Sequence, residues 1–158
     1  MPSFSTRRRV PFTPSQMFDL VADVEKYPRF LPLCEGLVIR SRGEKDGREV
    51  LVAAMTVGYK AIRETFTSRV ALDPAGARVD VSYVDGPFRY LENGWKFVAT
   101  SDGGCDVVFD ISYEMKSKMF ELLVGAVFER AFRKFAEAFE ARALQVYGPP
   151  QRPAITLA

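Results

Sequence analysis

The sequence contains no histidine among its 158 residues. Imidazole is the usual general base for serine and cysteine nucleophiles and a frequent metal ligand. Its absence excludes Ser-His-Asp and Cys-His catalysis, histidine metal sites and histidine acid–base chemistry. The sequence also has no glycine-rich phosphate-binding loop and no set of ligands at metal-binding spacing.

Cysteine is scarce. Cys34 and Cys105 are the two in the chain, with no CxxC spacing and no secretory signal before them. We therefore expect reduced thiols in a cytoplasmic protein rather than a disulfide framework. No apolar run approaches the length of a membrane span. The segment 1–10 is rich in serine and arginine; we interpret it as containing an edge strand, and a processed targeting segment is the alternative.

A strong net charge is absent as well. Twenty-two Lys and Arg against 20 Asp and Glu give +2, which is too small to indicate a nucleic-acid binder by itself. The length and the 47% hydrophobic content indicate one globular domain with a sizeable core. Phenylalanine, by contrast, is abundant, with thirteen residues. Two interpretations remain open: a core that is simply rich in phenylalanine, or a hollow core that holds an apolar ligand.

The segment 117–147 has the clearest helical pattern. Its apolar residues, five phenylalanines among them, fall on one arc at helical spacing, and charged residues fall on the opposite arc. Ser117 is a suitable N-cap, and Gly148-Pro149-Pro150 ends the pattern. We predict one long helix of roughly 40 Å. Its phenylalanine face requires a wide apolar surface to pack on.

Two short helices are predicted after a first strand at 4–10. Thr13-Pro14 opens the first helix. Tyr27-Pro28 should end it, because the residue before proline disfavours the helical conformation. A second turn or helix is expected at 29–33. This segment contains Phe30-Leu31-Pro32-Leu33, which we interpret either as a lid or membrane-touching lip, or as simple packing.

From residue 37 onward the hydrophobic period changes to two, which is typical of strands. Six strands are expected, at 37–42, 49–57, 61–72, 79–83, 91–99 and 107–115. A turn at 43–47 joins the first two of them. Consecutive hairpins imply an antiparallel sheet, and a twisted sheet of this size curls around a helix.

The predicted fold class is therefore α+β. It is a helix-grip fold, in which a curved antiparallel sheet of about seven strands surrounds a long C-terminal helix and two short helices follow strand one. Residues 1–148 are expected to form a single domain. Residues 149–158 are expected to form a flexible tail.

Three stretches carry a resemblance to a known family. They are FDLVADVEKYPRFLPLC at 18–34, GPFRYL at 86–91 followed by WKF at 95–97, and FDISYE at 109–114. Together they resemble the coenzyme Q-binding protein family, which belongs to the START-like, polyketide cyclase/dehydrase superfamily. The resemblance spans about residues 2–148. Leu33 departs from it, because many relatives have tryptophan at that position.

The resemblance implies a START-like fold with a hydrophobic cavity between the sheet and the long helix. The ligand implied is ubiquinone or a similar isoprenoid quinone, bound without turnover in support of respiration, with no further cofactor required. A respiratory membrane surface, at the cytoplasmic face of the inner membrane, is the implied place of action. Some bacterial members of the family are toxins that associate with the large ribosomal subunit and block subunit joining. A ribosome-associating regulator is therefore the alternative.

A quinone site needs apolar walls and one or two polar groups. Glu64 falls on the same strand face as Ile62 and Phe66, and Asn93 on the same face as Leu91 and Trp95. Either side chain can therefore meet the quinone ring or a water molecule in the cavity. A strand end, a bulge or a pairing with Arg8 is the alternative for these two, and a filled core is the alternative for the apolar walls. The full candidate set is Phe30, Leu31, Glu64, Phe66, Phe88, Arg89, Asn93, Trp95, Phe97, Phe120, Val124 and Phe128.

Catalytic signals are weak. The carboxylates Glu64, Asp85 and Asp110 show no pairing of the kind that acid–base catalysis requires. We expect a non-catalytic protein, with a cyclase-like activity as the minor alternative. RNA binding would need a basic surface, and a modest one near the C-terminal helix consists of Lys116, Lys118, Arg130, Arg133 and Lys134. Glu121, Glu129 and Glu137 reduce its positive charge. The sequence indicates neither an oligomeric state nor which quinone is bound.

Overall fold

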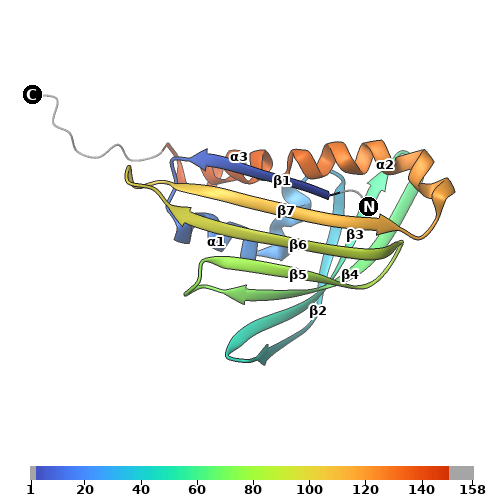
Figure 1. The fold of residues 1–158 in the computed structure, drawn as a ribbon, viewed down its shortest axis with the longest axis horizontal. Helices are drawn as coiled ribbons and strands as arrows, with labels where there is room; N and C mark the ends of the chain where they lie inside the picture. The colour runs from blue at the N-terminus through green and yellow to red at the C-terminus, as the bar shows by residue number, and fades with distance from the viewer. Residues whose placement is uncertain (1–2, 150–158) are drawn as a thin grey trace, which may run out of the picture.

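The computed structural model describes residues 3–149 and shows a seven-stranded antiparallel sheet with helices along one face (Figure 1). The strand order is β1-β7-β6-β5-β4-β3-β2. The strands are β1 (Ser3–Val10), β2 (Cys34–Lys45), β3 (Arg48–Tyr59), β4 (Ile62–Asp73), β5 (Arg78–Asp85), β6 (Phe88–Ala99) and β7 (Cys105–Met115). The helices are α1 (Pro14–Ala22), the 3₁₀ helix η1 (Val24–Arg29), α2 (Lys118–Arg133) and α3 (Phe135–Tyr147).

The predicted helix-grip class is confirmed. All seven expected strands are present, and β1 pairs with β7, so the first and last strands lie side by side. Alternation along β7 holds as expected, since its odd-numbered residues from Val107 to Met115 are all buried. Most of the predicted tail at 149–158 lies outside the described residues, so the domain boundary at 148 stays a prediction.

The turn between β2 and β3 is shorter than predicted. It consists of Asp46-Gly47 rather than residues 43–47, because these two residues have φ values of 54° and 79°. Positive φ at both central residues is what a two-residue type I′ hairpin requires. Gly43 and Glu44 therefore stay in β2, where they pair with Val50 and Glu49.

The helices after β1 also differ from the prediction. Thr13 caps α1 through a reciprocal pair of hydrogen bonds with Gln16, of 3.1 and 2.9 Å. The chain leaves the helix at Asp23, well before Pro28, and the second helix is η1 rather than a turn at 29–33. Burial of Tyr27 accounts for this path, because its hydroxyl donates to the carbonyl of Val21 and fixes η1 against α1.

The long C-terminal helix is two helices. Ser117 caps α2 as predicted, with its hydroxyl 3.1 Å from the amide of Phe120. The helix is interrupted at Lys134, whose amide bonds to the carbonyl of Ala131, three residues back. No glycine or proline causes the break. The break follows from packing, because α3 in its new direction brings two of its rings onto the sheet. The ring centroid of Phe135 lies 6.1 Å from that of Phe109, and the ring centroid of Phe139 lies 5.1 Å from that of Trp95.

The arginines of β1 have structural partners on both faces of the sheet. Arg7 and Arg9 point outward and bind the carboxylate of Asp106 on β7, at 2.9 and 3.1 Å. Arg8 points inward, where it meets Glu140 of α3 at 2.6 Å. Asp106 is thus a buried charge that is compensated by two guanidinium groups. Among residues 3–149, no helix is long and apolar enough to span a membrane.

The ion pairs of Asp106 with Arg7 and Arg9 predict that the stability of the fold depends on pH. The hydrogen bond from Arg9 is the largest of the effects that hold the pKa of Asp106 below its ordinary value. Its ionised form therefore stabilises the fold above about pH 4, and that stabilisation is lost as the pH falls through the folded-state pKa. We expect Asp106→Asn to lower the melting temperature at pH 7, with a deficit that shrinks toward about pH 2. Circular dichroism melts test this, with Asp46→Asn in the exposed turn as the control; an equal deficit at every pH would contradict it.

Candidate functional site

A cavity of about 90 Å³ lies between the sheet and the C-terminal helices. The sheet contributes residues from β2 to β7, and the helices contribute Phe128 and Phe132 from α2 and Phe135 and Phe139 from α3. Residues of η1 and of the connection to β2 complete the wall. The strand alternation and the phenylalanine face of the helices thus converge on one enclosed apolar space.

Half of the candidate residues lie in this wall. They come from four elements or connections, and they are Leu31, Phe66, Phe88, Asn93, Trp95 and Phe128. Phe66, Tyr83 and Phe128 surround Phe88, with ring centroids 5.6, 5.8 and 6.3 Å from it. The structure therefore brings these side chains together, and their role toward a ligand stays a prediction.

Four apolar candidates pack elsewhere in the core. Phe30 lies outside the cavity, with its ring 5.0 Å from Phe139 and the guanidinium of Arg142 5.3 Å from its centroid. Phe97 lies between Trp95 and Phe18 of α1, at 6.4 and 6.3 Å. The remaining two, Phe120 and Val124, occupy the N-terminal half of α2.

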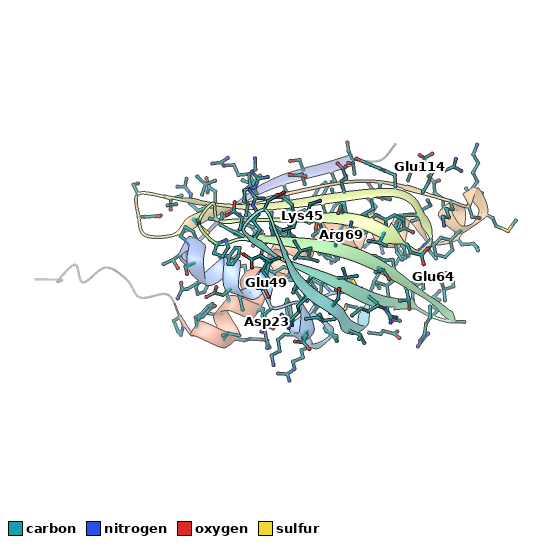
Figure 2. The ribbon with its side chains drawn as sticks, turned by 90° about the horizontal axis from the view of Figure 1, so that it is seen from below. Asp23, Lys45, Glu49, Glu64, Arg69 and Glu114 are labelled. Carbon is teal, nitrogen blue, oxygen red and sulfur yellow. The ribbon has the colours of Figure 1, made fainter. Side chains whose placement is uncertain are left out.

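The two charged candidates do not reach the cavity. Glu64 is half-buried on β4, opposite Val57 of β3, and lies toward one end of the sheet (Figure 2). Arg89 is exposed and follows the buried Phe88 on β6, where the pairing with β7 is irregular between Phe88 and Tyr90. Among residues 3–149, no Asp, Glu, Lys or Arg side chain lines the wall.

Three hydroxyl or amide side chains do line the cavity, and two of them are already bonded. Tyr27 donates its hydroxyl to the carbonyl of Val21, and burial raises its pKa. Asn93 donates from Nδ2 to the carbonyl of Asp110, at 2.8 Å. Ser68 on β4 was missed by the sequence analysis. Its signal is simple alternation, because it stands between Phe66 and Val70 on the apolar face of the strand.

The cavity approaches the surface near the β2 edge of the sheet. The wall residues here are only half-buried, and they are Leu33, Leu37, Met55 and Val57. Leu33 has a φ of 66°, a conformation that a leucine rarely adopts. Its carbonyl accepts the amide of Gly58 at 3.0 Å, which holds this strained residue at the mouth.

The cysteines show no sign of reactivity. Both are buried and free. Burial raises the pKa of each thiol to about 11, and neither cysteine lies in the cavity wall. Since the thiolate is the reactive form, these are structural core residues.

Gly86 packs closely against Phe66 of the cavity wall. It has a φ of +145°, and a Cβ at this position would lie 2.5 Å from the Cβ of Phe66 and 2.9 Å from its Cα. We therefore expect Gly86→Ala to destabilise the fold by about 2–4 kcal/mol. Gly103→Ala is the matched control, because Gly103 also has a positive φ, of +89°, but has no atom within 4 Å of the added Cβ. Urea unfolding compares the two; equal losses would show that backbone strain alone is responsible.

A curved antiparallel sheet that closes over C-terminal helices and encloses an apolar cavity defines the START-like, helix-grip class. The sequence agrees with this assignment: residues 10–140 match the family described as polyketide cyclase / dehydrase and lipid transport. The chain belongs to this family, as the three sequence motifs indicated.

Named relatives cover nearly the whole chain. The protein is 38% identical over 148 residues to the ribosome association toxin RatA of Vibrio cholerae, covering 94% of this chain and 99% of that one. It is 30% identical over 154 residues to the coenzyme Q-binding protein COQ10 homolog B, mitochondrial, of Xenopus laevis, covering 95% of this chain and 61% of that one. The solution structure of the 18 kDa protein CC1736 from Caulobacter crescentus is also similar. It has a TM-score of 0.76 and 34% identity, covering 94% of this chain and 100% of that one.

Proposed function

We propose that the protein binds an isoprenoid quinone such as ubiquinone in its cavity, as a non-catalytic carrier that supports respiratory electron transport. The chemistry of the wall carries the proposal. Aliphatic and aromatic side chains make up nearly all of it, and the described part of the chain places no charged group there. Ser68 and Asn93 supply uncharged polar groups on the sheet side. The name of the Xenopus relative, a coenzyme Q-binding protein, supports the same ligand class.

The size of the cavity sets a condition on binding. Its volume of about 90 Å³ is below the ~150 Å³ of an engineered cavity that admits benzene. It is also well below the roughly 300–1,000 Å³ of typical ligand pockets. The wall must therefore widen to take a quinone ring, and the flexible side chain of Met55 and the strained Leu33 lie where that movement is easiest.

The isoprenoid tail must leave through the mouth. Met119, Leu122 and Leu123 of α2 are 72%, 87% and 65% exposed, which is unusual for large apolar residues. We place the tail along this exposed apolar part of α2, where it would also meet a respiratory membrane surface.

Filling the cavity should abolish quinone binding. Ala131 is buried in the wall on α2, and Ala126 is exposed on the same helix. We expect Ala131→Leu to reduce co-purified quinone at least tenfold, because the added side chain occupies the ring space, whereas Ala126→Leu should match the wild type.

The measurement uses protein expressed in a quinone-producing bacterium, extracted with organic solvent and analysed by mass spectrometry. Circular dichroism checks that each variant is folded. Folded wild-type protein that carries no quinone and takes up none when it is added would exclude the carrier function.

A second candidate is a ribosome-associating regulator that binds the large subunit and blocks subunit joining. It is favoured by the higher identity to the Vibrio relative, 38% against 30% for the Xenopus relative. Arg130 and Lys134 are exposed beside the Glu129–Arg133 ion pair on the outer side of the helices, where they could contact RNA phosphates.

Co-sedimentation with purified large subunits across a salt series tests this second function. If it holds, binding should weaken steeply with salt and be lost in an Arg130→Glu, Lys134→Glu double variant. An Arg40→Glu, Lys45→Glu variant on the distant β2 should bind normally. Absence of binding at low salt would exclude it.

A further inference from the structure

The hydroxyl of Ser68 is buried without a hydrogen-bond partner. Within residues 3–149, Ser68 Oγ and Arg78 Nε are the two buried side-chain polar atoms that lack one. Ser68 is 6% exposed and lines the apolar cavity. A buried hydroxyl with no partner loses its hydration without compensation, so alanine would be the more stable residue in an empty cavity.

Alternation along β4 directs this hydroxyl inward, because Ser68 stands between Phe66 and Val70 on the apolar face of the strand. The neighbouring strand β5 has a bulge at this point, since Ser68 pairs with Tyr83 and Thr67 with Asp85, which leaves Val84 of β5 unpaired. The next residue, Arg69, is exposed on the outer face (Figure 2).

The other polar groups of the wall already have partners. Tyr27 donates its only hydroxyl proton to Val21, and Asn93 donates one of its two amide N–H groups to the carbonyl of Asp110. A carbonyl oxygen is an acceptor and needs a donor. The hydroxyl of Ser68 is a free donor that can rotate toward it.

We propose that Ser68 donates a hydrogen bond to a carbonyl oxygen of the bound ligand and so orients its ring toward β4. The proposal rests on the function proposed above and adds to it a selectivity: the cavity prefers an apolar molecule with a ring carbonyl over a hydrocarbon of the same shape. A hydroxyl that is left unpaired by a hydrocarbon disfavours that ligand, as unpaired buried polar groups do in other selective sites.

Binding of two probes tests the proposal. The probes are decylubiquinone and decylbenzene, which lacks the carbonyl groups, each titrated against tryptophan fluorescence of the purified protein. We expect Ser68→Ala to weaken binding of decylubiquinone about tenfold and to leave decylbenzene binding equal or tighter. Ser68→Thr, which keeps a hydroxyl, should retain the preference. Ser82→Ala, on the exposed face of β5, is the control.

Two further readouts separate ligand contact from a structural role. The infrared carbonyl stretch of bound decylubiquinone should shift to lower frequency in the wild type and lose this shift in Ser68→Ala. The melting temperature of the ligand-free Ser68→Ala variant should be equal to or above that of the wild type.

The outcomes are distinguishable. Equal weakening of both probes, or a lowered melting temperature of the empty variant, would assign Ser68 a structural role and overturn the proposal. Unchanged decylubiquinone binding in Ser68→Ala would overturn it while leaving the carrier function intact. A wild-type protein that binds neither probe would overturn both.

Discussion

Aromatic packing between α3 and the middle of the sheet is the interaction on which the structure depends. Phe139 is fully buried, and its ring lies 5.1 Å from Trp95 on β6, 5.3 Å from Tyr27 of η1 and 5.0 Å from Phe30. Removing such a ring typically costs about 3–5 kcal/mol. This single side chain joins the sheet, the N-terminal helices and the C-terminal helices, and the break at Lys134 allows it to do so.

The cavity is a consequence of the same packing. The rings of α3 fill the space over β6 and β7, whereas α2 meets the sheet through Phe128 and Phe132 at the edge of an unfilled volume. An apolar space next to a mouth of half-buried residues can exchange a ligand without unfolding the sheet. The aromatic packing of α3 therefore provides stability. The aliphatic side of the cavity wall, near Leu33 and Met55, provides the movement that ligand binding requires.

The sequence predicted those features that depend on local patterns. Strand alternation located all seven strands, and it correctly separated the inward residues of β7 from Asp110 on the wet face. The break at Lys134 could not be predicted, because no residue in 117–147 is a strong helix breaker and only contact with the sheet redirects the chain. The same applies to η1, whose path follows from the burial of Tyr27.

The candidate site was predictable to about the same extent as the fold. Alternation assigns a residue to a face but not to a depth, so Trp95 lies in the cavity wall while Phe97, two residues further on the same face, packs against α1. Ser68 does not stand out in the sequence, because it is a small hydroxyl residue between two apolar neighbours of its strand face. Its lack of a partner is visible only once the neighbouring strands are in place.

The proposed quinone binding requires the space between sheet and helices to open. Methyl NMR with added decylubiquinone would detect this opening, because methyl groups of Val81, Leu91 and Ile111 report on the wall and those of Val38 and Val98 report on the exposed surface. We expect saturable shifts at the three wall residues and none at the two surface residues. Shifts confined to the surface methyls, with the wall unchanged at saturation, would contradict it.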